Sequence, residues 1–221
     1  MAHLFISVRE LLLGLVLVFI INTAAFASYY IPSESMTPGL LVGDHLVVSK
    51  FAYGYSNHSL AGTPDLFEGR IFERPVKRGD VAVFEMEKEG RETTYIKRIL
   101  GLPGDVIAVR RGMLLINGES VLRERLAGAQ YRETLPGGRS YTTFDKMESA
   151  GDNAGPYVVP AGHYFALGDN RDNSADSRWR PPQGLGFIPA ANLVGRAEVI
   201  LWSWTGWQDF FRPERTLSRI R

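Results

Sequence analysis

The chain has 221 residues, enough for one good-sized domain with its own core and at most a smaller inserted lobe. Its 25 Lys and Arg balance 24 Asp and Glu, so the overall charge gives no reason to expect a nucleic acid or a strongly acidic substrate. The sequence contains no cysteine, which excludes disulfides, thiolate metal sites and cysteine nucleophiles. This absence does not identify the compartment, because cysteine-free proteins occur in reducing and oxidising ones.

Residues 11–27, LLLGLVLVFIINTAAFA, form an apolar run without a charge. As a helix the run would be about 25 Å long, at the short end for crossing the hydrocarbon core of a bilayer, and residues 28–31 would lengthen it. It predicts one membrane anchor within residues 1–30. A cleavable secretory signal is the competing interpretation, because the tripeptide at 25–27 (AFA) has the small-x-small pattern of a cleavage site. The pattern alone favours neither interpretation.

Both interpretations place the rest of the chain across the membrane. Arg9 and the α-amine precede the run, whereas no Lys or Arg occurs between Glu10 and Lys50. This asymmetry predicts a cytoplasmic N-terminus.

Beyond the anchor, short β-branched or alternating runs predict a mainly β fold. Turn signals such as Pro-Gly-Asp at 103–105 separate them, and no stretch holds a helical period for three turns. Two polar segments, 54–74 and 124–156, are predicted to be surface excursions or an inserted lobe outside the central sheet. The predicted strands are 45–51, 80–84, 93–100, 105–109, 113–116, 163–167 and 194–201.

Ser35 has the surroundings that a nucleophile needs. It lies in a short loop between Pro32 and Pro38, beside an apolar strand and other hydroxyls. Taken alone, a Ser-rich turn is the commoner explanation of such a loop. A histidine base is not supported, because the four histidines show neither a Gly-x-Ser-x-Gly partner nor metal-ligand spacing such as His-Glu-x-x-His.

Lysine replaces histidine as a base when burial keeps it neutral. Only about one Lys in 2500 is neutral at pH 7, and lowering the pKa by about two units raises that fraction about a hundredfold at a cost of about 2.7 kcal/mol. Strand alternation puts Tyr95, Lys97 and Ile99 on one face, which suits Lys97 for burial. Arg98 cannot serve, because its guanidinium does not deprotonate. From these residues alone, Lys97 is equally well explained as an ordinary strand lysine whose amine reaches solvent.

Four segments, taken together, resemble the type I signal peptidase family of Ser-Lys serine peptidases. Their order and spacing also match, and the resemblance covers most of residues 31–202. It implies a peptidase domain at 31–221, with an open β-barrel-like catalytic core at about 31–103 and 163–221 and a smaller β-rich lobe inserted at about 104–162. The segments are PSESMTP (32–38), GDHLVVSK (43–50), YIKRILGLPGD (95–105) and GDNRDNSADSR (168–178).

The resemblance also implies a role for each site residue. Ser35 is expected to attack the scissile carbonyl, and Lys97 to take its proton as general base. Ser174 is expected to orient the Lys97 amine, and the Ser33 hydroxyl with the Ser35 N–H to form the oxyanion hole. The residues expected to support the site structurally are Asp169, Asp172, Asp176 and Arg178.

The acidic segment at 168–178 has a competing interpretation as a calcium loop. Aligned as an EF-hand it fails, because Arg171, Ser174 and Arg180 occupy the third, sixth and twelfth positions, where an oxygen ligand, a glycine and a glutamate belong. The sequence therefore predicts neither a metal nor a cofactor.

The resemblance implies an endopeptidase that removes signal peptides from exported preproteins after small residues of the Ala-x-Ala type, bound as extended strands. The expected partners are signal peptides and the lipid bilayer, with no nucleic acid, and the chain is expected to be a monomer. The implied location is the bacterial cytoplasmic (inner) membrane, single-pass, with the anchor retained and the catalytic domain on the outer face. Met36 is expected to line the groove near Ser35, although a loop methionine is as often a simple packing residue.

The C-terminal region is rich in aromatic and basic side chains, which predict either a membrane-contact patch or a tail that closes the core. These residues are Trp202, Trp204, Trp207, Phe210, Phe211, Arg212, Arg215 and Arg219.

Three alternatives remain open. A peptidase of the same chemistry dedicated to one secretion or conjugation system would share every motif. A catalytically silent, membrane-anchored binding module is disfavoured by intact Ser35, Lys97 and Ser174. A soluble self-cleaving repressor with the same pair of residues is contradicted by the apolar run at 11–27.

Overall fold

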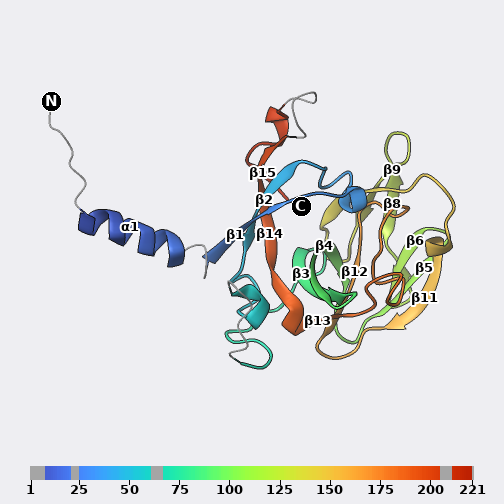
Figure 1. The fold of residues 1–221 in the computed structure, drawn as a ribbon. Helices are drawn as coiled ribbons and strands as arrows, with labels where there is room; N and C mark the ends of the chain where they lie inside the picture. The colour runs from blue at the N-terminus through green and yellow to red at the C-terminus, as the bar shows by residue number, and fades with distance from the viewer. Residues whose placement is uncertain (1–7, 21–24, 61–66, 205–210, 221) are drawn as a thin grey trace.

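The computed structural model describes residues 8–20, 25–60, 67–204 and 211–220. Figure 1 shows one helix, α1 (Val8–Ile20), followed by a body built of strands. The protein is therefore mainly β, as its alternating runs predict. Short 3-10 helices interrupt the loops: η2 (Glu34–Met36), η3 (Asn57–Ser59), η4 (Ala150–Asp152), η5 (Ala190–Asn192) and η6 (Pro213–Arg215).

The large sheet has eight strands, and the pairs along it are antiparallel. Because β14 lies between β2 and β3, this sheet joins the first and last parts of the chain. In spatial order its strands are β1 (Phe26–Tyr30), β2 (Asp44–Ser49), β14 (Leu193–Ser203), β3 (Val81–Lys88), β4 (Arg91–Gly101), β12 (His163–Leu167) and β13 (Ile188–Pro189), with β15 (Ser218–Arg219) paired to β14.

Two smaller sheets are formed by the chain between β4 and β12. One has the order β10 (Ser140–Phe144), β9 (Gln130–Thr134), β8 (Leu122–Arg125). The other has the order β11 (Asn153–Val158), β5 (Val106–Arg110), β6 (Met113–Ile116), β7 (Glu119–Ser120).

The seven predicted strands are confirmed, to within a few residues at their ends, as β2, β3, β4, β5, β6, β12 and β14. The segment 124–156 lies outside the large sheet, as predicted, but it contains β9, β10 and β11, whose polar sequences gave no separate strand signal. The alternation of buried and exposed side chains in such strands appears only in the structure. In β10, for example, Tyr141 and Thr143 are buried between partly exposed neighbours.

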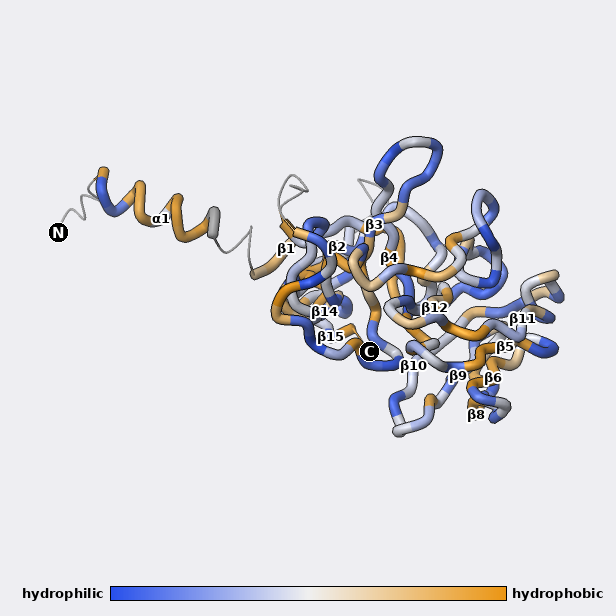
Figure 2. Tube along the Cα trace, turned by 90° about the horizontal axis from the view of Figure 1, so that it is seen from below, coloured by the Kyte–Doolittle hydropathy of each residue, from blue (hydrophilic) through white to orange (hydrophobic). Residues whose placement is uncertain are grey.

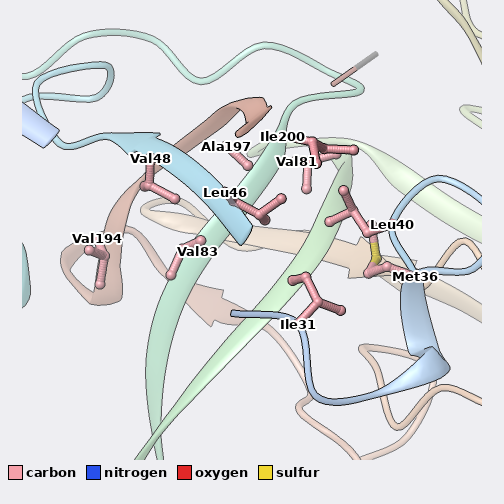
Figure 3. Close-up of a cluster of buried hydrophobic side chains, with 10 residues drawn as sticks. All are labelled: Ile31, Met36, Leu40, Leu46, Val48, Val81, Val83, Val194, Ala197 and Ile200. Carbon is pink, nitrogen blue, oxygen red and sulfur yellow. The ribbon is translucent and has the colours of Figure 1, made fainter. Parts of the chain in front are cut away.

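A buried apolar cluster joins the loop after β1 to the large sheet (Figure 3). Met36 and Leu40 come from that loop, and they pack with Leu46 of β2 and Val81 of β3. Fully burying one such side chain contributes about 2 kcal/mol, so the loop is fixed by its own apolar residues. The prediction that Met36 lines the groove was wrong, because its side chain is in this core with 0% exposure.

α1 is apolar along most of its length, as Figure 2 shows. Among the described residues, no helix combines the length and the apolar character needed to span a bilayer. The suggested lengthening of the helix through residues 28–31 was wrong, because Phe26–Tyr30 is a strand that pairs with β2. Ser28, for example, lies opposite Val47.

Two C-terminal arginines close the core. Arg215 Nη2 lies 2.5 Å from Oδ2 of fully buried Asp44, and Arg212 Nη1 donates to the Val42 carbonyl oxygen at 3.1 Å. The closing-tail interpretation is therefore confirmed for these two residues. Trp202, Trp204 and Phe211 are exposed, and the predicted patch residues Trp207 and Phe210 lie outside the described part of the chain.

Candidate active site

Ser35 lies in η2, in the loop whose apolar side chains are buried in the core. The backbone of this loop is also held from the 168–178 segment. Asn170 donates its backbone N–H to the Ser35 carbonyl oxygen at 3.2 Å, and its side-chain amide donates to the Glu34 carbonyl oxygen at 3.2 Å. Both faces of the loop are thus fixed, which sets the position of the Ser35 hydroxyl.

Lys97 comes from β4, and its side chain is buried, as its place in the strand predicts. The Lys97 Nζ donates to Ser35 Oγ at 2.7 Å and to the Ile96 carbonyl oxygen at 2.9 Å. Burial lowers the pKa of Lys97 from 10.5 to about 8, although the charges of Asp176 and Asp169 act in the opposite direction. With a pKa of about 8, about one amine in ten is neutral at pH 7.

Ser33 lies next to the nucleophile candidate. Its Oγ is 3.4 Å from Ser35 Oγ, and the Ser33 side chain is exposed to solvent. The Ser33 hydroxyl is thus close to the position that a substrate carbonyl attacked by Ser35 would occupy. A hydrogen-bond donor there stabilises the negative charge that develops on the carbonyl oxygen.

Ser174 lies close to the pair but makes no hydrogen bond with it. A side chain on Gly168 would lie 2.3 Å from Ser174 Oγ and 2.4 Å from the Ser35 carbonyl oxygen, so only glycine allows these segments to meet. The Ser174 Oγ is buried without a hydrogen-bond partner. The expected hydrogen bond to Lys97 is therefore not formed, since the amine donates to Ser35 and Ile96 instead.

The four predicted support residues make structural contacts. Asp169 accepts two hydrogen bonds from Arg98, at 2.7 and 2.6 Å, and both side chains are almost fully buried. Asp176 pairs with Arg178 at 2.9 Å and accepts the Gly168 N–H at 3.1 Å. Asp172 accepts the backbone N–H groups of residues 146 and 147, at 2.6 and 3.2 Å.

The sequence did not identify Glu133, a residue of β9 that forms an ion pair with Arg171 of the 168–178 segment. Arg171 donates to both carboxylate oxygens of Glu133, at 2.9 and 2.6 Å, and Tyr141 donates to the same carboxylate at 2.6 Å. The Arg98 guanidinium lies 4.2 Å from the centre of the Tyr141 ring. One buried network therefore connects β9 and β10 to the catalytic segments, and Glu133 gave no signal because it lies in a polar run.

An apolar cavity of about 270 Å³ opens beside the Ser35–Lys97 pair. A larger, more polar hollow of about 790 Å³ near Asp80 and Arg139 is lined by neither of these residues, so its size does not make it the reaction site. The residues that line the smaller cavity are Tyr29, Tyr30, Ile31, Pro32, Ser33, Ser35, Val83, Thr94, Tyr95, Ile96 and Lys97.

A serine hydroxyl that contacts a buried lysine of lowered pKa, next to an apolar cavity, has the chemistry of a serine hydrolase in which lysine takes the place of histidine. The site and the mainly β fold thus define a class of enzyme before any relative is considered.

Comparison with known proteins identifies the family. The family profile described as "Signal peptidase, peptidase S26" matches residues 4–202. Signal peptidase I of Rickettsia typhi is 37% identical over 202 residues, which cover 83% of this chain and 75% of the relative. Signal peptidase I of Rickettsia bellii (strain OSU 85-389) is 35% identical over 213 residues, covering 88% and 72%.

The crystal structure of a signal peptidase I from Enterococcus faecalis V583 is 25% identical, covers 56% of this chain and 97% of that one, and superposes with a TM-score of 0.35. That superposition is too weak to support an argument. The sequence comparisons are sufficient: the chain belongs to the signal peptidase family, peptidase S26. It is a serine endopeptidase that removes signal peptides, as its four sequence segments predict.

The burial of Lys97 predicts a stability cost that depends on pH. The pKa of Lys97 is lower in the folded state than in the unfolded state. Below about pH 8 the amine is mostly protonated in both states, and its burial then lowers the free energy of unfolding by about 3 kcal/mol. This cost disappears as the pH rises from about 8 to above 10, because the amine becomes neutral. Lys97→Met should therefore unfold at higher denaturant concentration than wild type at pH 7, with a smaller difference at pH 10. Exposed Lys88→Met is the control, and an equal gap at both pH values contradicts this account.

Glu133 is predicted to be essential for the stability of the network. Glu133→Gln leaves the Arg171 guanidinium buried without a carboxylate, which costs about 3 kcal/mol in free energy of unfolding. Urea denaturation measures the change. Glu124→Gln is the matched control from the same small sheet, because Glu124 and its partner Arg132 are more than half exposed, and it should change stability by less than about 0.5 kcal/mol. Equal stability of the two variants would rule out the structural role.

Proposed function

We propose that Ser35 is the nucleophile and Lys97 the general base of this signal peptidase, and that the enzyme cuts after small residues of the Ala-x-Ala type. The observation that carries the assignment is the 2.7 Å contact between Lys97 Nζ and Ser35 Oγ, made across 62 positions of sequence. The same separation allows the Ser35 O–H to donate to the amine when Lys97 is neutral.

The reaction follows from this pair. Neutral Lys97 takes the hydroxyl proton while Ser35 Oγ bonds to the scissile carbonyl carbon. The resulting oxyanion accepts hydrogen bonds from the Ser35 N–H and the Ser33 hydroxyl. Collapse of this intermediate breaks the peptide bond, and the leaving amine receives the proton from Lys97. Water, activated by the same amine, then hydrolyses the ester and releases the signal peptide with a free carboxylate.

The environment of Lys97 supports this role energetically. A pKa of about 8 makes the neutral amine roughly 300 times more abundant at pH 7 than in a lysine with an ordinary pKa of 10.5. The base also remains strong enough to accept a proton from a hydroxyl. Arg98, next to it in β4, is instead paired with Asp169 and stays charged.

Ser174 is the proposed orienting hydroxyl. Gly168 lies against both Ser174 and the Ser35 carbonyl oxygen, and Ser174 Oγ has no hydrogen-bond partner within the described residues. It is therefore available to hydrogen-bond the amine as the proton is transferred. Asp169, Asp172, Asp176 and Arg178 act through the position of this segment and perform no chemical step.

The substrate is proposed to lie extended along the 270 Å³ cavity, with its backbone beside residues 29–33 and 94–97. Apolar walls and a modest volume suit small side chains at the cleavage point. The hydroxyls of Ser33 and Ser35 and the Lys97 amine supply the polar groups of this wall.

The chain is proposed to be a monomer anchored once in the bacterial cytoplasmic membrane by the apolar segment before β1, with the N-terminus inside and the peptidase domain on the outer face. The predicted boundary after residue 30 was wrong, because β1 (Phe26–Tyr30) belongs to the large sheet of the domain. The uncharged run at 11–27 supports the anchor. Exposed Trp202, Trp204 and Phe211 support contact of the domain with the lipid headgroup region. The catalytic core is proposed at about 26–103 and 163–221, with β1 included, around a lobe at about 104–162.

The catalytic assignment predicts the result of a cleavage assay. Detergent-solubilised enzyme should cut an Ala-x-Ala signal-peptide substrate after the final Ala, and Ser35→Ala and Lys97→Ala should each lower kcat at least about a thousandfold. Mass spectrometry of the products identifies the bond. Ser120→Ala and Lys88→Ala, at exposed positions, are the matched controls. Full activity in either site variant removes that residue from the mechanism.

The proposed base also predicts the pH dependence of activity. Because the neutral amine is the active form, kcat/KM should rise with pH and level off above about 8, the pKa of Lys97 in the free enzyme. Initial rates measured between pH 5.5 and 9.5 test this, with unfolding monitored by tryptophan fluorescence at each pH. A profile that is flat between pH 6 and 9 argues against Lys97 as the base.

The anchor is predicted to fail when charges enter the apolar run. The full chain should stay in bacterial membranes during alkaline carbonate extraction, whereas Leu15→Lys with Val18→Lys, at about 2.5 to 3.5 kcal/mol per charge, should be extracted. Immunoblotting of pellet and supernatant gives the readout, and Glu10→Lys, before the run, is the control. Extraction of the unaltered chain would exclude an integral anchor.

A further inference from the structure

Three side chains outside the reaction site meet near the end of the β3–β4 hairpin. His58 comes from η3, Glu85 from β3 and Glu92 from β4. The ligand atoms of all three lie within 4.8 Å of one another. His58 Nδ1 is 2.9 Å from Glu85 Oε2 and 3.4 Å from Glu92 Oε1.

The 3.4 Å separation of His58 Nδ1 and Glu92 Oε1 is the one expected in a tetrahedral zinc site, and the 2.9 Å hydrogen bond between His58 and Glu85 would lengthen by a few tenths of an ångström around an ion. Zn²⁺ binds His nitrogen and carboxylate oxygen at about 2.0 to 2.2 Å, which puts neighbouring ligand atoms about 3.3 Å apart. One imidazole and two carboxylates fill three of the four positions and leave one for water. The side chains of His58 and Glu85 are only 23% and 16% exposed, so they are already ordered by their surroundings.

The cluster also carries uncompensated negative charge. Within the described residues, His58 is the sole ion-pair partner of Glu85 and Glu92. Glu87 lies directly opposite Glu92 in the strand register, and like charges in such a pair are destabilising. Two carboxylates at one imidazole, with a third carboxylate opposite Glu92 in the register, are therefore a site where a divalent cation would lower the electrostatic free energy.

The cluster lies beside the catalytic cavity. Glu85 faces Thr94 across the hairpin, and residues opposite each other share a face of the sheet. Val83 and Thr94, on that same face, line the cavity. Glu85 is also close enough to Tyr29, another residue of the cavity wall, for its charge to add to burial in raising the Tyr29 pKa.

We propose that His58, Glu85 and Glu92 bind one Zn²⁺ ion, which fastens η3 (Asn57–Ser59) to the hairpin that forms one wall of the substrate cavity. The donor set favours zinc over magnesium, because Mg²⁺ prefers six oxygen ligands in octahedral geometry. No sequence motif marks the site, since its ligands are 27 and 7 residues apart along the chain and only the hairpin register and the path of η3 bring them together.

Zinc binding to the tag-free full chain in detergent micelles tests the proposal. Isothermal titration with ZnCl₂ should give one site per chain, and Tm should rise by about 5 °C at a hundredfold excess over Kd. His58→Gln and Glu92→Gln should each weaken zinc binding at least tenfold. Glu92 is half exposed, so its replacement does not disturb the core.

His163→Gln is the matched control, because His163 is also partly exposed and its ring nitrogen contacts the Ala161 carbonyl oxygen and no carboxylate within the described residues. It should keep wild-type zinc affinity. The proposal is overturned if wild type shows no saturable zinc binding, in which case the cluster is a His–Glu ion pair only. It is also overturned if His58→Gln binds zinc as tightly as wild type, or if MgCl₂ binds as tightly as ZnCl₂. The readout is binding, so it is independent of the assignment of Ser35 and Lys97.

Discussion

The site depends on keeping one amine out of water. Lys97 is buried, and among the described residues no carboxylate forms an ion pair with its Nζ, so its proton is held weakly and the amine acts as a base near neutral pH. Burial of this kind costs stability, which the rest of the fold must supply. The apolar packing of Met36 and Leu40, on the loop that carries Ser35, provides part of that stability at the point where position matters most.

Two neighbouring residues of β4 show that the charge state of a buried basic side chain depends on whether a carboxylate is paired with it. Lys97 and Arg98 are both buried, but Arg98 meets the carboxylate of Asp169 in a two-fold hydrogen-bonded pair and remains charged. Because successive side chains of a strand point to opposite faces, one face holds the base and the other holds the charge that anchors the catalytic segment. Breaking such a buried pair is costly, although forming it adds little net stability. The role of the Arg98–Asp169 pair in this protein is to fix the position of the backbone from Gly168 to Ser174 relative to β4.

The smaller sheets contribute to the site from a distance. Glu133, in the segment that the sequence marked only as a polar excursion or lobe, neutralises Arg171 within the catalytic segment. The cluster of His58, Glu85 and Glu92 adds a second link, between η3 and the hairpin beside the cavity. Segments that are polar in sequence thus add paired charges to the apolar packing that residues such as Leu135 and Tyr141 provide.

The sequence by itself determined five of the eight strands of the large sheet, because period-two alternation is a local property, and it marked Ser35 and Lys97 through residue type and motif. It assigned β1 to the anchor and gave no signal for the two-residue strands β13 and β15. Other features depended on contacts between distant segments and on side-chain packing, which local patterns do not encode. Only the tertiary structure placed Met36 in the core, left Ser174 without a partner and joined Glu133 to Arg171. The reason is the sheet order: β4 lies between β3, whose Val81 packs in the same cluster as Met36, and β12, which leads into the 168–178 segment, so segments distant in sequence meet around the pair.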